Sequence, residues 1–499
     1  MFLLLLYLLP VALGAVNPLQ KPIGTKFEPE IKIDKTAFNH TIPTKTNGPA
    51  NLEGYKLRIE MVQPTAVDMD PNSVQWSGYL DTPTNDKHLF FWMFQSRKNF
   101  AEDPVFLWLQ GGPAYSSLYG MLQQFGPKLM KYDATVDSHY KLEDNEYALN
   151  AGATVIFLEQ PVGTGFSYGT PVDSTYAAVE DIVAFLTLLY ETFSKVLGKQ
   201  EFHIAGQSYS GHTIPTLANR IVKDLSKTIN LQSVLIGNGD IDELTQKVST
   251  YQMACDPELS PDPKYLLSKG DCVPMQGNLA RCLQEIEACR KARIDCGGWF
   301  DDPCWTGLVL YYWEKKNLDP YDLGNSRPYQ TERNKVDEFN LLEKLLNEVW
   351  TDAQIGVDLS KVPGGKWQRV NAVVSKTFGP SGDKMRSYQE QLDQLVGGSR
   401  VRVLLYAGDT DLVVPFLGVK QIAKNVKWKH QNSFVELANQ PENSFRILES
   451  QTTNQVFGNY VKIDNLMYAR IFGAGHMVME KRGIELRDLY YKWMYNDID

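Results

Sequence analysis

Residues 202–215, Phe-His-Ile-Ala-Gly-Gln-Ser-Tyr-Ser-Gly-His-Thr-Ile-Pro, join a short apolar strand to a serine that small residues flank on both sides. Gly206 lies two positions before Ser208, Ser210 lies two positions after it, and a helix-like segment follows at residues 213–225. A strand that turns directly into a helix leaves room only for small side chains at these two positions, a pattern known as a nucleophile elbow. We therefore expect Ser208 to be exposed in the turn, near a helix N-terminus whose partial positive charge favours an oxyanion.

Short apolar runs on both sides of this turn predict a sheet. The expected strands are residues 74–79, 88–95, 104–110, 154–158, 202–205, 232–237, 401–407 and 469–472. Residues 177–196 have the periodicity of an amphipathic helix. Short apolar strands that alternate with helices are typical of an α/β fold with a mostly parallel central sheet and helices on both faces.

The pattern changes between about residues 240 and 396, where strand signals are few. All six cysteines lie in this region, between Cys255 and Cys304. An even number of clustered cysteines without a Cys-x-x-Cys pair indicates disulfides rather than zinc ligands, although spacing alone leaves their pairing open. We expect an insertion that forms a disulfide-bonded cap over the carboxyl edge of the sheet.

The N-terminal residues are almost wholly apolar and end in small side chains, which is typical of a secretory signal. We expect a signal peptide at residues 1–15 and a polar leader or pro-segment at residues 16–54, with a glycosylation sequon at Asn39-His-Thr41. No later apolar run is long enough to cross a bilayer. We therefore expect no membrane association after the signal is removed.

Composition and charge exclude several other classes of protein. The chain has 499 residues, of which 43% are apolar and 22% charged, as is ordinary for a globular protein. Its net charge is −9 and it has no run of Lys or Arg, so a nucleic-acid partner is not expected. We expect neither a metal ion nor a cofactor, and the sequence does not indicate an oligomeric state.

A serine nucleophile needs a histidine base, and the chain has seven histidines to choose from. His476 has the expected position, because the predicted strand at 469–472 continues into Gly473-Ala-Gly-His at its carboxyl end. His203 lies inside the strand that precedes Ser208 and is expected to be a packed core residue. His212 is too close to Ser208 in the sequence to turn back onto it.

The carboxylate that orients the base is predicted at a second strand exit. The strand at 401–407 ends in Gly408-Asp-Thr-Asp, which offers Asp409 and Asp411, and spacing alone does not choose between them. The chain order serine, aspartate, histidine is that of the α/β-hydrolases. For the oxyanion hole we expect the backbone N–H of Tyr209 together with that of Gly112.

Five ordered motifs resemble the serine carboxypeptidases, and among these the carboxypeptidase Y group of the yeast vacuole. They are Trp108-Leu-Gln-Gly-Gly-Pro113, Phe157-Leu-Glu-Gln-Pro-Val-Gly-Thr-Gly-Phe-Ser-Tyr168, Gly206-Gln-Ser-Tyr-Ser-Gly-His-Thr-Ile-Pro215, Tyr406-Ala-Gly-Asp-Thr-Asp411 and Gly473-Ala-Gly-His-Met477. The resemblance implies an α/β-hydrolase domain over residues 55–499. Such an enzyme removes residues one at a time from the C-terminus of peptide substrates through an acyl-enzyme.

Position by position, the resemblance implies further roles. It selects Asp411 over Asp409 as the third member of a triad with Ser208 and His476. It also implies the disulfide pairs Cys255–Cys272, Cys282–Cys304 and Cys289–Cys296. Gln20-Lys-Pro-Ile23 resembles the sorting element of the vacuolar members, so the expected route is secretory, toward a vacuole- or lysosome-like lumen or the cell exterior.

The chain departs from the family where the terminal carboxylate of the substrate is bound. The family usually provides an asparagine and two glutamates, and this chain has Gln110, Gln124 and Gln207 at those positions. Gly111 and Met477 are further expected substrate contacts, as is Val414, which replaces a cysteine that often lines the leaving-group pocket. The usual Gly-Cys after Gly-Gly-Pro is Ala114-Tyr115, so one family disulfide is absent.

An amide donates hydrogen bonds at any pH, whereas a carboxyl must be protonated to do so. We therefore expect recognition of a C-terminal carboxylate to persist with less acid dependence. Two other functions remain open. The first is an esterase, amidase or acyltransferase on the same scaffold, and the second is an inactive secreted homologue, against which the intact triad and Gly-Gly loop argue.

Overall fold

The computed structural model describes residues 40–41, 52–63, 67–83, 86–133, 135–136, 138–292, 296, 303–325, 341–350 and 352–498. The predicted signal peptide, Asn39 and most of the predicted leader lie outside these residues. Within the predicted leader, β1 (His40–Thr41) pairs antiparallel with β2 (Lys56–Val62). In the part of the chain that is described, no helix is long and apolar enough to cross a bilayer.

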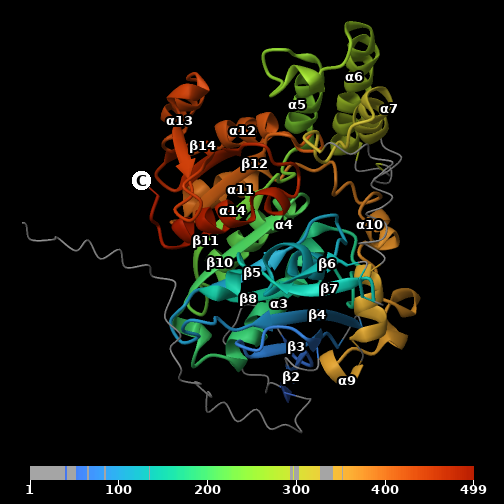
Figure 1. The fold of residues 1–499 in the computed structure, drawn as a ribbon, viewed down its shortest axis with the longest axis vertical. Coiled ribbons are helices and arrows are strands. Elements are labelled where there is room, and N and C mark those ends of the chain that lie inside the picture. Colours follow the sequence, from blue (N-terminus) through green and yellow to red (C-terminus); the bar gives the residue numbers. More distant parts are fainter. Residues whose placement is uncertain are drawn as a thin grey trace, which may run out of the picture. The chain divides into compact units, whose positions relative to one another are not determined.

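The described strands form a sheet of thirteen, ordered β1-β2-β3-β4-β8-β5-β10-β11-β12-β15-β14-β13, with β9 paired to β4 (Figure 1). The six central strands, from β8 to β15, run parallel, and the strands at both edges are antiparallel. The bounds not yet given are β3 (Gln75–Asp81), β4 (Lys87–Phe94), β5 (Val105–Leu109), β8 (Thr154–Leu158), β9 (Tyr168–Gly169), β10 (Glu201–Gln207), β11 (Asn230–Gly237), β12 (Arg402–Gly408), β13 (Arg446–Glu449), β14 (Val456–Ile463) and β15 (Leu466–Ile471). The prediction of an α/β fold with a mostly parallel central sheet is confirmed.

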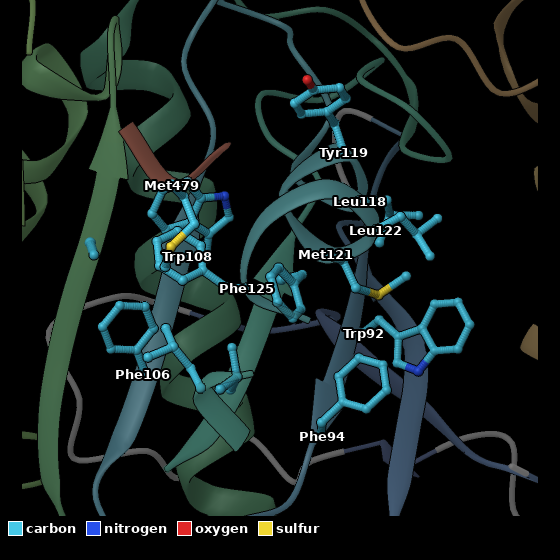
Figure 2. Packing of buried hydrophobic residues seen from close by; sticks show 14 of the residues in the cluster. Trp92, Phe94, Phe106, Trp108, Leu118, Tyr119, Met121, Leu122, Phe125 and Met479 are labelled. Atoms are coloured by element: carbon cyan, nitrogen blue, oxygen red, sulfur yellow. The ribbon is translucent and has the colours of Figure 1, made fainter. Parts of the chain in front are cut away.

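Successive side chains of a strand point to opposite faces of the sheet. In the central strands, the side chains on both faces are buried. On one face, Trp108 of β5 and Tyr406 of β12 lie in the same apolar cluster as α14 (Val478–Met494), whose Tyr490 hydroxyl is 2.5 Å from that of Tyr406. Figure 2 shows part of this cluster. On the other face, Leu107 and Leu405 are equally buried. Near-continuous apolar runs are what such doubly covered strands require.

Helices that cover the sheet come from several parts of the chain. Helix α3 (Thr175–Thr192) packs against α4 (Ser210–Arg220), which contacts β10, β11 and α11 (Gln389–Gly398). Helix α12 (Phe416–Asn425) contacts β12 and β15. Helix α4 begins three residues before the predicted segment 213–225, which ends in the π-helical turn η4 (Ile221–Leu225).

Between β11 and β12 the described residues form helices and turns but no named strand. The bounds not yet given are α5 (Glu243–Cys255), η5 (Pro263–Tyr265), α6 (Lys269–Ala292), η6 (Trp305–Leu310), α7 (Tyr311–Lys316), η8 (Leu345–Val349), α9 (Asp352–Ile355), η9 (Leu359–Lys361), η10 (Pro363–Gly365) and α10 (Ala372–Thr377). Part of this region lies against the carboxyl edge of the sheet. Leu412 N–H donates to the Pro320 carbonyl, and Leu323 N–H donates to the Thr410 carbonyl.

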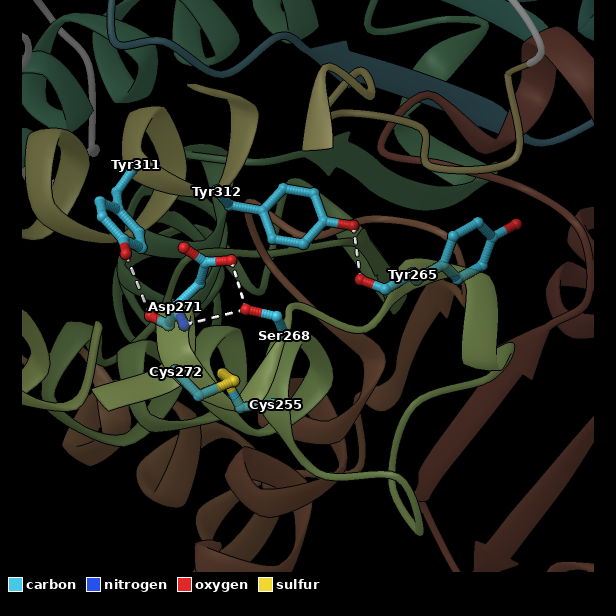
Figure 3. Close-up of a disulfide and its surroundings, with 7 residues drawn as sticks. All are labelled: Cys255, Tyr265, Ser268, Asp271, Cys272, Tyr311 and Tyr312. Carbon is cyan, nitrogen blue, oxygen red and sulfur yellow. Dashed lines mark hydrogen bonds between the residues drawn. A yellow bond between two sulfur atoms is a disulfide. The ribbon is translucent and has the colours of Figure 1, made fainter. Parts of the chain in front are cut away.

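Three disulfides join the pairs that the resemblance implies, Cys255–Cys272, Cys282–Cys304 and Cys289–Cys296. Figure 3 shows the first, which links the end of α5 to the first turn of α6. Ser268 precedes α6, and its hydroxyl accepts a hydrogen bond from the Asp271 N–H at 3.1 Å. A backbone N–H in the first turn of α6 thus has a side-chain hydrogen-bond partner, and the same turn is joined to α5 by a disulfide.

The strands that the sequence did not predict are mainly edge strands and a separate hairpin. They are β1, β2, β9, β13 and β14 in the main sheet and the pair β6 (Lys128–Tyr132) and β7 (Tyr140–Asp144). In strand β2, whose sequence is Lys-Leu-Arg-Ile-Glu-Met-Val, only Leu57 and Val62 are buried, and the other residues are exposed or half-buried. Strands of this kind lack the continuous apolar run that marks a central strand.

Candidate active site

The elbow holds Ser208 in a left-handed backbone conformation between β10 and α4, with φ of 61°. Ser208 is partly exposed, while the residues on both sides of it are buried. Its N–H donates to the Gly237 carbonyl at 3.0 Å, and its carbonyl accepts from the N–H groups of Gly211 at 2.9 Å and Asp240 at 2.8 Å. A residue in this uncommon conformation needs such restraint, and the turn presents its hydroxyl outward.

Close packing explains why a glycine precedes the serine by two positions. A Cβ atom on Gly206 would lie 2.3 Å from the Leu109 carbonyl oxygen and 2.5 Å from the Ser210 hydroxyl oxygen. Contacts this short are forbidden, so the small residue is required by the approach of β5 and α4 to the turn.

His476 and Asp411 are in hydrogen-bond contact. His476 Nδ1 lies 2.7 Å from Asp411 Oδ2, and both side chains are buried. Asp411 also accepts from Asn238 Nδ2 at 2.7 Å and from the Val413 N–H at 2.8 Å. The ring of Tyr321 packs edge-on against the imidazole, with the two centroids 5.3 Å apart. With Nδ1 held by the carboxylate, Nε2 is left to face a substrate or a nucleophile.

Asp409, the other candidate acid, has different partners. Its Oδ1 accepts from the Gly473 N–H at 2.8 Å, and its Oδ2 accepts from Arg470 Nη2 at 3.1 Å. The structure therefore brings Asp411, and not Asp409, to His476. Asp409 instead fixes the loop that leads to the histidine.

Ser208, Asp411 and His476 share one edge of the sheet. They follow β10, β12 and β15, which run parallel with β11 between β10 and β12. The exit of β11 connects them, because Gly237 accepts from Ser208 and Asn238 donates to Asp411. The carboxyl ends of parallel strands are where α/β proteins place their ligands.

The Gly111–Gly112 loop packs directly on the elbow. A Cβ atom on Gly111 would lie 2.6 Å from the Gln207 carbonyl oxygen and 2.7 Å from both the Ser208 Cβ and the Tyr209 nitrogen. Gly112 has φ of 121°, which only glycine adopts readily. The loop and the Tyr209 N–H therefore meet at Ser208, the arrangement that a two-donor oxyanion hole requires.

Main-chain pairing holds this loop, in which Tyr115 stands where the resemblance implies a cysteine. Tyr115 and Val370 form an antiparallel bridge, and the Asn371 N–H donates to the Ala114 carbonyl at 3.1 Å. The loop is therefore attached to the residues before α10 without a disulfide.

The three glutamines predicted to bind a substrate are buried near this edge. Gln110 Oε1 accepts from Trp108 Nε1 at 3.0 Å. Gln124 Nε2 lies 3.4 Å from the sulfur of Met477, and its Oε1 has no hydrogen-bond partner among the described residues. Gln207 is the last residue of β10, directly before Ser208. Gln124 is thus a buried amide with an unused acceptor oxygen, and its Nε2 lies beside the residue that follows His476.

Asn238 was not predicted from the sequence, where Gly-Asn-Gly after a strand indicates only a turn. Its Nδ2 donates to Asp411 Oδ2 and lies 3.3 Å from the carbonyl oxygen of Val414, and its Oδ1 accepts from the Gly408 N–H at 3.2 Å. It thus links the exits of β11 and β12. The signal that could have found it is a polar residue at the carboxyl end of a buried strand.

Glu159 is a second buried polar residue that the sequence did not single out. It follows β8, and its Oε1 accepts from the Ser116 hydroxyl at 2.5 Å and from Trp367 Nε1 at 3.4 Å. Burial raises the pKa of Glu159 to about 8, although these hydrogen bonds oppose the shift. Glu159 is therefore an uncharged acid at neutral pH, and it supports Ser116 at the start of α2 (Ser117–Gly120).

No group of three or more His, Cys, Asp and Glu side chains in the described residues is arranged to hold a metal ion. The site itself provides a serine, a histidine and an acid in Ser208, His476 and Asp411. Such a set acts by nucleophilic attack and acid–base transfer.

Comparison with known proteins identifies a family. Residues 64–496 match the family model described as serine carboxypeptidase. Carboxypeptidase Y homolog A from Arthroderma otae is 35% identical over 448 residues, which cover 89% of this chain and 78% of that protein. The protein of the same name from Trichophyton tonsurans is 36% identical over 436 residues, covering 86% of this chain and 75% of that protein.

A solved structure shares the fold. It is that of Kex1(delta)p, a prohormone-processing carboxypeptidase from Saccharomyces cerevisiae, with a TM-score of 0.70 and 21% sequence identity. The match covers 90% of this chain and 97% of that one.

Proposed function

Because the chain belongs to the serine carboxypeptidase family, we propose that it hydrolyses peptides from the C-terminus through a Ser208–Asp411–His476 triad. The observation that carries this proposal is the 2.7 Å contact between His476 and Asp411 at the sheet edge where the elbow holds Ser208. The orientation of the histidine by a buried acid is what activation of a serine requires.

The proposed reaction has two stages. His476 Nε2 accepts the proton of the Ser208 hydroxyl as its oxygen attacks the carbonyl carbon of the last peptide bond, and Asp411 stabilises the imidazolium. The N–H groups of Gly112 and Tyr209 bind the oxyanion of the tetrahedral intermediate. His476 then protonates the departing amino acid, and a water molecule, deprotonated by His476, releases the acyl group from Ser208.

A mixed peptide pool tests the function directly. Residues are expected to be released one at a time from the C-terminus, as read by mass spectrometry. C-terminally amidated peptides lose a hydrogen bond to a charged group, roughly 1.5–3 kcal/mol, and are expected to react with kcat/KM about 10- to 150-fold lower. Equal rates for amidated and acid peptides would instead indicate an esterase or amidase. Failure of a fluorophosphonate to label Ser208 would indicate an inactive homologue.

We further propose that Gln110, Gln124 and Gln207 bind the terminal carboxylate of the substrate. All three are buried, and each amide keeps its donor at every pH. A clamp of this kind does not depend on protonation of an acid, which removes one source of pH dependence from KM.

The expected result is a KM that changes less than about threefold between pH 4 and pH 8 for a blocked dipeptide. In Gln124→Glu, KM is expected to rise by about tenfold or more over the same range, because the introduced carboxyl ionises and repels the substrate carboxylate. Gln123→Glu, at the neighbouring half-buried position, serves as the matched control and is expected to follow the unmodified enzyme. A steep pH dependence of KM in the unmodified enzyme would contradict the proposal.

We also propose that the chain enters the secretory pathway, with a vacuole- or lysosome-like lumen or the cell exterior as its destination. The apolar N-terminal segment and the three disulfides support this route, since disulfides persist in oxidising compartments. Fusion of residues 1–54 to a fluorescent reporter tests the route and distinguishes the two destinations.

A further inference from the structure

A buried cluster of charged side chains lies behind the nucleophile elbow, and the proposed reaction does not use it. His212, in the first turn of α4, is fully buried. Its Nε2 lies 3.7 Å from Asp240 Oδ1, and its Nδ1 lies 3.9 Å from Asp383 Oδ2. Asp240 follows β11 and Asp383 precedes α11, so the cluster joins three separate parts of the chain.

Asp383 is held as a carboxylate by its surroundings. It accepts hydrogen bonds from the hydroxyl groups of Tyr209 at 2.6 Å, Tyr388 at 2.7 Å and Thr175 at 2.6 Å, and from the Thr175 N–H at 3.0 Å. Burial alone would raise the pKa of Asp383, but His212 and these hydrogen bonds lower it to about 2. A carboxylate with four donors and a neighbouring histidine remains ionised well below neutral pH.

The contacts of His212 fit an imidazolium and not a neutral ring. Neither ring nitrogen has a hydrogen-bond partner among the described residues, yet each faces a carboxylate at ion-pair distance. A neutral ring would leave these two buried carboxylates without a cation at ion-pair distance among the described residues. The ring is also enclosed by Tyr209 and Tyr388, with centroids 4.2 Å and 4.4 Å away, and aromatic faces attract cations.

Other charged groups lie further from His212. Glu243 and Lys247 pair with each other at 3.1 Å on α5, near Asp240, and Arg386 lies near Tyr388. Burial disfavours the charged form of His212, but Asp240 and Asp383 outweigh it and raise the pKa of His212 to about 9. The folded protein therefore holds this proton more tightly than the unfolded chain does. The stabilisation is complete below about pH 6.5 and is lost as the pH rises through about 9.

The cluster is attached to the reacting groups through two short connections. The Asp240 N–H donates to the carbonyl of Ser208 at 2.8 Å. The side chain of Tyr209, whose N–H is the proposed oxyanion donor, is fixed by its hydroxyl to Asp383. Ser208 has a left-handed φ, so its conformation depends on such attachments.

We propose that His212 is a positioning residue: a buried cation that joins Asp240 to Asp383 and thereby holds Ser208 and the Tyr209 N–H in their reactive arrangement. The proposal rests on the proposed function of Ser208. His212 itself touches neither substrate nor reacting atoms, so its loss acts through the geometry of the elbow. A displacement of the order of 1 Å at a reacting group costs about 10²-fold in rate.

The test compares His212→Gln with His203→Gln. His203 is also fully buried, lies on β10 and bonds Ser233 through Nδ1 at 2.8 Å, but burial lowers its pKa to about 3, so it carries no charge. For His212→Gln we expect kcat to fall by about tenfold or more with KM nearly unchanged, and fluorophosphonate labelling of Ser208 to slow equally. For His203→Gln we expect both rates within about twofold of the unmodified enzyme. His212→Lys, which keeps a cation, is expected to recover part of the lost kcat.

A second measurement needs no variant. The rate of Ser208 labelling in the unmodified enzyme is expected to fall as the pH rises through about 9, while circular dichroism shows a folded protein. Wild-type rates in a folded His212→Gln, or labelling that stays constant up to pH 10, would overturn the proposal. Absence of labelling in the unmodified enzyme would instead contradict the proposed function itself.

Discussion

Replacement of Asp411 by asparagine is expected to lower kcat by about 10⁴-fold while leaving the protein folded. Oδ2 of Asp411 accepts from His476 and Asn238, and Oδ1 accepts from the Val413 N–H. An asparagine supplies one acceptor and one donor, so in either orientation its amide N–H faces another donor. The negative charge that stabilises the imidazolium is lost in both orientations.

Asp409→Asn provides the matched control, because it makes the same chemical change two residues away. Asparagine can still accept from the Gly473 N–H, and Arg470 retains Glu442 as an ion-pair partner. The expected loss of kcat is less than about tenfold. Steady-state kinetics with one blocked dipeptide measure both variants, and thermal unfolding shows that each is folded. Equal losses of activity would mean that Asp411 supports the loop and does not orient the base.

Replacement of Gly111 by alanine is expected to lower kcat by about 10²- to 10³-fold, which is the cost of losing one oxyanion donor. The added Cβ would lie within 2.7 Å of three atoms of the elbow, including the Tyr209 nitrogen. Two of the three belong to the main chain, so the loop must move away from Ser208. The Gly112 N–H then no longer reaches the oxyanion.

Gly198→Ala is the control for this substitution, because a Cβ atom on Gly198 would meet no atom within 4 Å. It is expected to change kcat by less than about twofold. The rate of fluorophosphonate labelling is the sharper readout for Gly111→Ala, since it reports the reactivity of Ser208 without binding of a peptide. If labelling and kcat were unchanged, the Gly112 N–H would not be a donor of the proposed oxyanion hole.

The central sheet could be predicted from the sequence because its strands are buried on both faces. Strand β5 is apolar at every position and β8 at every position after Thr154, and such a run can be recognised without knowing which strands lie beside it. Strands β2 and β13 are half exposed and carry polar residues, so their pairing depends on partners that are distant in the sequence.

In the candidate site, too, the sequence predicts the residues that have a local signal and not the contacts that depend on distant parts of the chain. Ser208 and His476 follow apolar strands with glycine-rich exits, a local signal that the sequence shows. Whether Asp409 or Asp411 meets the histidine depends on how the chain turns after β12, which no spacing rule determines. Asp383 lies 171 residues after His212, outside any strand exit, and only the folded chain brings the two together.

The attachment of the Gly111–Gly112 loop has a consequence for redox behaviour. All three disulfides lie between Cys255 and Cys304, whereas this loop is held to residues 369–371 by main-chain hydrogen bonds that contain no sulfur. Reduction of the three disulfides would therefore break none of the contacts that join the loop to residues 369–371.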